Sequence, residues 1–384
     1  MLRPGARIVL AFAVLPFLPL SAHAQLAVSA NDGKAVLVDG VSSVPASPAA
    51  DYVAIIDLNT SPPKVIAEIA APASVVGPPQ SVAVAGDETF ALVTGAMKID
   101  PADAKKTVPD DALTVIDLKS SPPKATQTLQ AGKGAAGVSI NRAGTLALVA
   151  NRSEGTVSIF SIADKTLTSA GKIEFGEKSG PSHVAFLPDG KTALVTRDGD
   201  SRIAVLTIDG NKVEYTKRDM AAGLRPYSID VSGAGDVAVV GNVGVGLGDN
   251  DTISLIDLKA SPLRVVDTVT VGPTPESVSL SPDGAFVAVT VVNGSNRPKS
   301  SPHFNDYGLL KIYSISGGKL APVTEAKVGH WCQGSAWSKD GHTLLHQCMV
   351  EFEIMVFGFD GKTLAPKDPI KLKAGPAGIR TAGR

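Results

Sequence analysis

The residues best suited to chemistry are concentrated near the C-terminal end of the chain, between Gly329 and Cys348. This stretch, GHWCQGSAWSKDGHTLLHQC, contains both cysteines, both tryptophans and three of the six histidines. Thiolates and imidazoles are ligands that zinc prefers, whereas two cysteines can also form a disulfide. The spacing excludes haem attachment of the Cys-x-x-Cys-His type. The stretch is therefore either a metal or redox site or a crosslinked part of the scaffold.

Two further segments carry side chains that could bind a cation or transfer a proton. Residues 249–251, Asp-Asn-Asp, offer oxygen ligands, but an EF-hand loop needs more ligands at fixed spacing and a terminal glutamate, so a turn is favoured. His303 lies in a long connection beside Asp306 and Tyr307, where it is either a mobile acid or base or a surface histidine. The chain has no G-x-S-x-G, P-loop or H-E-x-x-H motif.

A repeated strand–turn–strand unit must position these residues. Each copy is an alternating apolar run, a turn rich in Gly and Asp, and a second apolar strand. The copies occupy residues 26–40, 81–95, 137–151, 183–197, 228–242, 277–291 and 334–348. A third strand follows at 51–58, 111–118, 155–162, 201–208, 251–258, 308–315 and 352–359. With a more polar fourth strand after most of these, the pattern predicts an all-β fold, a seven-bladed β-propeller of four-stranded antiparallel blades.

The tail of the chain is expected to close the ring. The lead-in residues before the hairpins align at Pro79, Ala135, Pro181, Pro226, Pro275, Cys332 and Gly378. The tail KAGPAGIRTAGR thus resembles the other lead-ins and should join the blade whose hairpin is 26–40. Closure by both termini leaves no exposed edge strand, so residues 25–384 are expected to be one propeller domain.

Unequal loop lengths predict a binding face. The connections between second and third strands are long in four repeats, whereas the turns at the opposite ends have about four residues each. Polar side chains at the strand ends on that face should form a funnel at the mouth of the channel. Among them are His183, Arg197, Arg225 and Glu276. Its arginines could pair with a carboxylate or hold a lactone. The candidate ligand-binding residues are Asn151, Arg152, Asn242, Tyr227, His303, His330, Trp331, Gln333 and Arg380.

The last hairpin should bring the two cysteines together. Reflection across its turn, residues 338–341, places Cys332 opposite Gln347, one residue from Cys348, and such registers are uncertain by one residue. Cysteines that are near neighbours across two strands can form a disulfide, which we predict here.

A four-ligand zinc site in this hairpin is excluded by distance. His342 and His346 are four residues apart on one strand, or about 13 Å, so they cannot bind one ion together. A smaller site made of His346 and both thiolates is the remaining alternative. The sequence leads us to expect no metal and no cofactor.

The N-terminus resembles a cleavable export signal. Arg3 and Arg7 precede an apolar run at 8–20 and an Ala-His-Ala sequence at 22–24, which predicts a signal peptide of residues 1–24 cut after Ala24. The apolar run is too short to span a membrane. We therefore expect a periplasmic or secreted protein with no membrane span.

The charge of the chain argues against a polyanion partner. The whole chain has a formal charge of -1, and removal of Arg3 and Arg7 leaves 34 basic and 37 acidic residues. No nucleic acid partner is expected.

The repeats resemble a known family. The sequences LVAN (148–151), LVTR (194–197) and VVGN (239–242) are similar to degenerate copies of the YVTN-type repeat of exported bacterial seven-bladed propellers. That lactonase-like superfamily includes sugar-acid lactonases, lactonising cyclases and the large subunits of periplasmic amine dehydrogenases. Its lactonase-like members use His, Arg and Glu at the channel mouth. The resemblance implies catalytic roles for His183, Glu276, Arg197 and Arg225.

Three functional hypotheses follow from the sequence. The first is an exported propeller that binds an unknown partner protein or a small anionic ligand on its loop-rich face. The second is a lactonase or cyclase that acts on a lactone or carboxylate at the channel mouth. The third is a scaffold subunit of a periplasmic dehydrogenase, whose quinone cofactor would reside in a separate small subunit. Fold alone does not choose between them.

Overall fold

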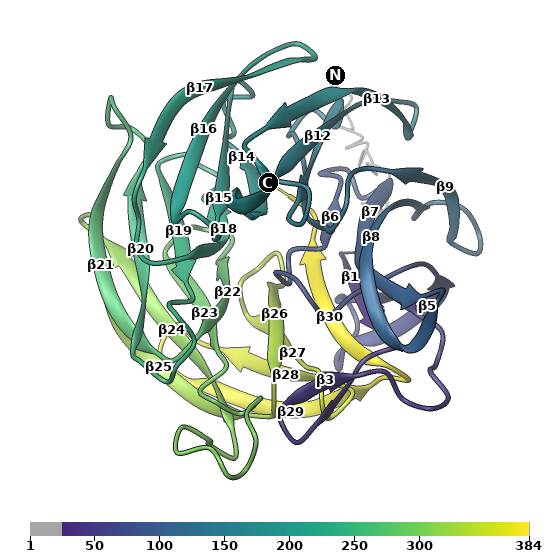
Figure 1. Ribbon diagram of the computed structural model, residues 1–384. Coiled ribbons are helices and arrows are strands. Elements are labelled where there is room, and N and C mark those ends of the chain that lie inside the picture. Colours follow the sequence, from purple (N-terminus) through teal and green to yellow (C-terminus); the bar gives the residue numbers. More distant parts are fainter. Residues whose placement is uncertain (1–24, 384) are drawn as a thin grey trace, which may run out of the picture.

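Seven four-stranded antiparallel sheets surround a central axis in the computed structural model, which describes residues 25–383 (Figure 1). The predicted seven-bladed β-propeller is confirmed. The predicted signal peptide, residues 1–24, lies outside the described residues. Within the described part of the chain, no helix is long and apolar enough to cross a membrane.

The blades are numbered one to seven along the chain, and each strand is named from the axis outward. The innermost strands are β30 (Gly375–Thr381), β6 (Val82–Val84), β10 (Ala135–Ile140), β14 (Pro181–Phe186), β18 (Pro226–Val231), β22 (Pro275–Leu280) and β26 (Cys332–Trp337). The second strands are β1 (Leu26–Asp32), β7 (Phe90–Asp100), β11 (Leu146–Asn151), β15 (Thr192–Arg197), β19 (Val237–Asn242), β23 (Phe286–Val291) and β27 (Thr343–Cys348).

The outer half of each blade follows the same order. The third strands are β4 (Tyr52–Asp57), β8 (Asp103–Asp117), β12 (Thr156–Ala163), β16 (Arg202–Asp209), β20 (Asp251–Asp257), β24 (Gly308–Ser316) and β28 (Glu353–Phe359). The outermost strands are β5 (Lys64–Ala70), β9 (Lys124–Gln130), β13 (Thr166–Glu174), β17 (Lys212–Met220), β21 (Arg264–Gly272), β25 (Lys319–Val328) and β29 (Leu364–Lys371). Outside the blades lie a small hairpin, β2 (Val36–Val38) and β3 (Val41–Ser43), and one turn of 3-10 helix, η1 (Glu177–Ser179).

The core lies between neighbouring blades. The second strands are mostly apolar and are buried on both faces because each blade packs against two others; every residue of β11 is buried. The outermost strands expose one face to solvent, so β5 mostly alternates between exposed and partly buried residues. The long apolar runs in the sequence are thus second and third strands, and the polar runs form the rim.

Both termini close the ring, as predicted, but the predicted N-terminal hairpin 26–40 is wrong. Residues 26–32 form only the second strand of blade one, and the innermost strand comes from the C-terminal tail, because β30 pairs with β1. The tail also aligns differently from the prediction. Asn31 pairs with Pro376, as Asn151 pairs with Ala135, so Pro376 rather than Gly378 begins the repeat.

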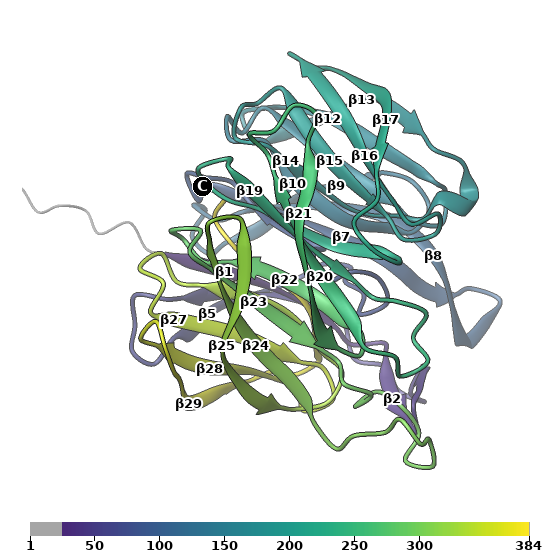
Figure 2. The ribbon, with the colours of Figure 1, turned by 90° about the vertical axis from the view of Figure 1, so that its left-hand side faces the viewer.

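The long connections project from one side of the disc, which we call the loop face. The β2–β3 hairpin and the far end of the β7–β8 ribbon lie on this side, and the C-terminus lies at the other side of the disc (Figure 2). The long connection expected in blade two is largely strand, since β7 and β8 continue beyond the blade as a paired ribbon.

Candidate active site

A buried carboxylate, Asp198, organises a cluster of charged residues at the loop face. Arg152 donates two hydrogen bonds to it, from Nε to Oδ1 at 3.0 Å and from Nη2 to Oδ2 at 2.6 Å. Arg225 donates from Nη2 to Oδ2 at 2.8 Å, and the hydroxyl of Ser182 donates to Oδ1 at 2.7 Å. The Asp198 side chain is 2% exposed, whereas the two arginine side chains are about one third exposed. The cluster therefore presents two fixed guanidinium groups to solvent above a buried anion.

Backbone contacts of the repeat hold the residues of this cluster in place. Arg152 follows the last residue of β11, and its amide donates to the carbonyl of Gly134 at 2.9 Å. Asp198 follows the last residue of β15, and its amide donates to the carbonyl of Gly180 at 3.0 Å. The two residues thus occupy the same position in successive blades.

Arg225 occupies a position where a side chain is costly. It precedes β18 with a φ of 55°, in the left-handed region, and the equivalent residues before β10 and β14 are Gly134 and Gly180. A residue with a Cβ atom pays roughly 1 kcal/mol in that conformation. Arg225 offsets this strain through its ion pair with Asp198 and through a bond from Nη1 to the carbonyl of Gly244 at 3.3 Å.

Glu276 is the free carboxyl group of the cluster. It is partly buried near the start of β22, and none of the residues 25–383 forms a hydrogen bond or ion pair with its side chain. Burial is the main reason that the pKa of Glu276 rises to about 7, and the nearby charges of Arg152 and Arg225 limit the rise. At neutral pH this carboxyl group can therefore both accept and donate a proton.

Tyr227 forms the apolar wall beside these charges. It is 7% exposed, and the guanidinium carbon of Arg152 lies 5.6 Å from the centre of its ring. Burial, followed by the negative charge of Glu276, raises the pKa of the Tyr227 hydroxyl, so this group stays protonated. The phenol can donate a hydrogen bond but cannot serve as a base near neutral pH.

The cluster suits an anionic or carbonyl-bearing ligand. With Glu276 protonated, two guanidinium groups and one carboxylate give a local charge of +1, and ionisation of Glu276 makes the cluster neutral. Nη1 of Arg152 has no hydrogen-bond partner among residues 25–383, so it remains available to a ligand. The arrangement combines an acid or base with fixed donors for developing negative charge.

Arg197 points away from this cluster, although the sequence placed it in the same funnel. Its guanidinium forms ion pairs with Asp200 at 2.7 Å and Asp219 at 3.1 Å and lies over the ring of Phe175. Nη1 also donates to the hydroxyl of Tyr215 at 3.2 Å. Arg197 therefore ties β15 to the outer strand β17, while the next residue, Asp198, faces the channel mouth.

His183 and Arg380 belong to a different part of the channel. They line a cavity of about 170 Å³ with Asp230 and the turns between first and second strands, on the side opposite the loop face. Burial and the positive charge of Arg380 lower the pKa of His183 well below its ordinary value. Arg380 pairs with Asp230 at 3.2 Å, because the shift of the tail alignment to Pro376 places it in the far half of β30.

Buried amide side chains lie between this cavity and the loop-face cluster. Gln80 of blade two donates from Nε2 to the hydroxyl of Ser277 of blade six at 3.3 Å, across the axis. Gln333 is fully buried, and its Nε2 donates to the carbonyl of Trp331 at 3.1 Å. Gln333 thus lies within the channel wall rather than at its surface.

Asn151 and Asn242, which the sequence predicts to bind ligand, donate hydrogen bonds to the neighbouring third strands. Nδ2 of Asn151 donates to the hydroxyls of Thr156 and Ser158, both at 2.9 Å. Asn242 makes the equivalent bonds to β20 in blade five, at 3.1 and 3.0 Å. Both side chains are buried, so they stabilise the pairing of second and third strands.

The other predicted ligand residues lie on the loop face, at blades five to seven. Nδ1 of His330 lies 2.6 Å from Glu351, and Nε2 lies 3.1 Å from Asp306. Although partial burial alone would lower the pKa of His330, these two carboxylates raise it above its ordinary value. His303 is exposed and its ring contacts the backbone of Gly248, which joins the long connections of blades five and six.

Trp331 packs at the junction of blades seven and one. Its side chain is partly buried against Ala35, Val75, Met349 and Ala377. Its φ of 44° matches the left-handed conformation of Arg225 in blade five. Trp331 therefore borders the loop face at blade seven.

The predicted disulfide between Cys332 and Cys348 is confirmed. The two cysteines are directly paired across β26 and β27. The hairpin is centred between Asp340 and Gly341, one residue beyond the predicted centre, which alone would place Cys332 opposite Met349. A β-bulge between Cys332 and Ser335 moves the partner of Cys332 back by one residue, to Cys348. Equivalent bulges occur in the first strands of blades three to six.

Asp198, the centre of the cluster, was not among the predicted site residues. The repeat carried a signal that could have found it, because Asp198 and Arg152 both directly follow the last residue of a second strand. Oppositely charged residues in the same column of adjacent blades are candidates for an ion pair between those blades.

Comparison with known proteins points to a lactonase family. A family model described as "Lactonase, 7-bladed beta-propeller" matches residues 93–297, whereas no curated protein sequence matches the chain. A putative 6-phosphogluconolactonase from Bacteroides uniformis is 19% identical, with a TM-score of 0.71, over 94% of this chain and 100% of that one. A periplasmic gluconolactonase from Pseudomonas aeruginosa is 17% identical, with a TM-score of 0.66, over 93% of this chain and 99% of that one.

At such identities the two solved structures show a common fold and nothing further. The family match is the stronger finding, because it spans more than half of the chain. The matched range includes all five residues of the cluster, which are Arg152, Asp198, Arg225, Tyr227 and Glu276. The chain belongs to the lactonase family of seven-bladed β-propellers.

Proposed function

We propose that the protein hydrolyses a lactone of a sugar acid at the loop-face cluster. The observation that carries this proposal is the position of Glu276, an unpaired carboxyl group with a pKa of about 7 near two fixed arginines. Family membership supports the reaction class, and the similar structures that are named as gluconolactonases support the substrate class. The predicted signal peptide and the disulfide support an exported enzyme.

In the proposed reaction Glu276 acts first as a base and then as an acid. Its carboxylate takes a proton from a water molecule, and the hydroxide attacks the lactone carbonyl. The carbonyl oxygen gains negative charge that Arg152 and Arg225 stabilise, with Asp198 holding both guanidinium groups in place. When the ring C–O bond breaks, the protonated Glu276 returns its proton to the leaving alkoxide. The products are a carboxylic acid and a free hydroxyl group, and the enzyme is unchanged.

The test is hydrolysis of a panel of five- and six-membered sugar-acid lactones by the purified protein. Glu276→Gln removes the base but keeps the shape of the side chain, so we expect kcat/KM to fall by roughly 100-fold or more. Glu325→Gln is the matched control, because Glu325 is exposed on the outer strand β25, where it pairs with Lys311.

Two outcomes would contradict the proposed lactonase activity. One is that Glu276→Gln and Glu325→Gln hydrolyse the best lactone equally well. The other is that the wild type hydrolyses no lactone. A wild-type protein that hydrolyses no lactone could still bind the open-chain sugar acid. If Arg152→Met then abolishes this binding, the hypothesis of a ligand-binding protein replaces that of an enzyme.

A further inference from the structure

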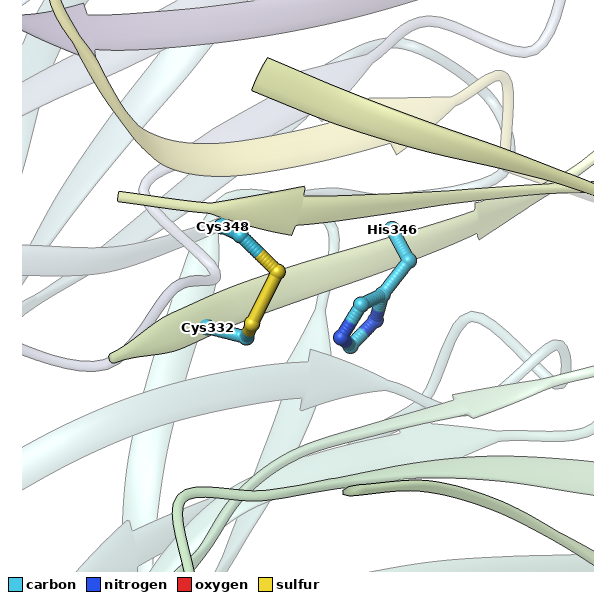
Figure 3. A group of neighbouring side chains, drawn as sticks. All are labelled: Cys332, His346 and Cys348. Carbon is cyan, nitrogen blue, oxygen red and sulfur yellow. A yellow bond between two sulfur atoms is a disulfide. The ribbon is translucent and has the colours of Figure 1, made fainter. Parts of the chain in front are cut away.

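A second group of reactive side chains lies in blade seven, apart from the candidate active site. The sulfur atoms of Cys332 and Cys348 and a ring nitrogen of His346 all lie within 4.8 Å of one another. All three residues are completely buried. The imidazole ring lies beside the disulfide, on the same side of the β26–β27 hairpin (Figure 3).

His346 is an unusual residue for its position. It pairs with Ser335, and the equivalent positions in blades three to six hold the apolar residues Val149, Val195, Val240 and Val289. Packing between blades therefore requires only an apolar side chain here. Burial lowers the pKa of His346 to about 3, so its ring stays neutral in the folded protein.

One nitrogen of this ring has a partner and the other has none. Nδ1 lies 2.8 Å from the hydroxyl of Ser335, whereas Nε2 is buried without a hydrogen bond among the described residues. An unsatisfied buried polar atom costs on the order of 1–3 kcal/mol. When Nδ1 carries the proton and donates it to Ser335, the lone pair of Nε2 is free to bind a metal, an arrangement common in metal-bound histidines.

Met355 adds a thioether to the group. Its Sδ lies 3.9 Å from Sγ of Cys348, and the residue is paired with His346 across β27 and β28. The interior of blade seven thus gathers two cysteine sulfurs, one thioether and one neutral imidazole. Such a set is soft, and soft ligands of this kind select Cu(I).

We propose that the reduced form of this group binds one Cu(I) ion through Cys332, Cys348 and His346, with Met355 as a fourth ligand. The disulfide first accepts two electrons and two protons from an external dithiol, which becomes a disulfide in turn. Cu(I) then binds the two sulfurs and displaces their protons. With metal–sulfur bonds of about 2.3 Å, the two sulfurs must separate to roughly 3.8 Å, which side-chain rotation can provide.

The ligand set favours copper over zinc. Zinc is bound by thiolate, imidazole and carboxylate groups, and a thioether is not among its usual ligands. Cu(I) accepts thioether ligands and does not need water in its coordination shell, which suits a site whose three principal ligands are fully buried.

The test compares the reduced and oxidised proteins without oxygen. The protein is reduced with a phosphine, the phosphine is removed, and free thiols are counted while circular dichroism confirms the fold. Cu(I) is then supplied as its bicinchoninate complex. We expect the reduced protein to withdraw one Cu(I) ion per chain, and the oxidised protein to withdraw none.

Variants identify the ligands in this experiment. His346→Val installs the residue found in the other blades, so the fold should be kept, while the affinity for Cu(I) should fall by at least about 10-fold. Met355→Leu should cause a smaller loss. His342→Gln is the control, since His342 lies at the other end of the same hairpin with its Nδ1 3.2 Å from the carbonyl of Phe359.

Four results would overturn the proposal. They are equal uptake of copper by the oxidised and reduced proteins, unchanged affinity in His346→Val, loss of the fold when the disulfide is reduced, and stoichiometric binding of Zn(II) without binding of Cu(I). The last result would leave a metal site but refute the copper assignment.

Discussion

Glu276 should set the pH dependence of the proposed hydrolysis. Because its pKa is raised to about 7 and only the carboxylate can act as the base, kcat/KM should fall about tenfold per pH unit below that value and level off above it. The measurement is a pH profile of kcat/KM, corrected for spontaneous lactone hydrolysis. The residual activity of Glu276→Gln should not show this rise of kcat/KM with pH. A wild-type profile that is flat between pH 5 and 8 would contradict the assignment.

The same residue makes a prediction about stability that requires no substrate. The pKa of Glu276 is raised from 4.5, so the folded protein binds a proton more tightly than the unfolded chain between about pH 4.5 and 7. The free energy of unfolding contributed by Glu276 must therefore decrease as the pH rises through this window. Glu276→Gln has no carboxyl group to ionise, so its free energy of unfolding does not decrease in this way. The Tm of the variant minus the Tm of the wild type should therefore be larger at pH 8 than at pH 4.5.

Two residues that are adjacent in sequence show what a pattern of residue types cannot reveal. Arg197 and Asp198 both lie at the loop-face end of blade four, but they point to opposite sides because successive side chains along a strand alternate. Arg225, Tyr227 and Glu276 lie close together at the loop face, and their functional roles stay predictions. The repeat could not tell which of two neighbouring residues faces the channel mouth, since that depends on the local register.

At the scale of elements, the His330 contacts tie the long connection of blade six to the short connection of blade seven. Asp306 lies between β23 and β24, and Glu351 lies between β27 and β28. Because these carboxylates raise the pKa of His330, its contribution to stability is complete below the ordinary histidine pKa and is lost as the pH rises through the folded-state value. The contacts are therefore strongest in mildly acidic solution.

This gives a prediction for the variant His330→Gln. Its Tm should fall below that of the wild type at pH 5.5, and the difference should be smaller at pH 9, because less of the wild-type imidazole is protonated there. Thermal unfolding at the two pH values measures the effect, with His342→Gln as the control. Equal differences for His330→Gln at both values would show that the charge of this histidine is unimportant.

The strands were easier to predict from the sequence than their pairing. Second and third strands are buried on both faces, so their apolar runs stand out, and all seven predicted third strands are present. The N-terminal hairpin was misassigned because 36–43 also has a strand-like pattern, but it forms a separate hairpin on the loop face. Residues far apart in sequence form blade one; the lead-in pattern of the tail predicted that it joins this blade, but not that it supplies the innermost strand in the observed register.

At the scale of the whole molecule, the propeller depends on its closing strand. β30 brings the buried residues Ala377 and Ile379 between blades and provides the only innermost partner of β1 within residues 25–383. Its loss would remove several kcal/mol of burial and a complete hydrogen-bonded ladder, which is comparable with the roughly 5–15 kcal/mol stability of a typical protein.

Deletion of residues 375–384 should therefore abolish cooperative unfolding or lower Tm by roughly 10 °C or more. The matched control replaces the β2–β3 hairpin, 36–43, by a short Gly-Ser linker. Within residues 25–383 its strands pair only with each other, and its turn adds one hydrogen bond, from the amide of Lys299 to Asp39, so its removal should change Tm by much less. Calorimetry of both variants tests the comparison, and similar Tm values for the two would contradict the role of β30.

The side-chain contacts that cross the central axis of the propeller also affect how substrate and product reach and leave the proposed site. Gln80 meets Ser277, and Arg380 meets Asp230, in each case between blades on opposite sides of the ring. These contacts narrow the channel between the proposed site and the opposite side of the disc. We therefore expect substrate to enter and product to leave by the loop-face opening, past Arg152 and Arg225. The carboxylate product should then compete with unreacted lactone for Arg152 and Arg225. Product inhibition is therefore expected to be competitive with respect to the lactone.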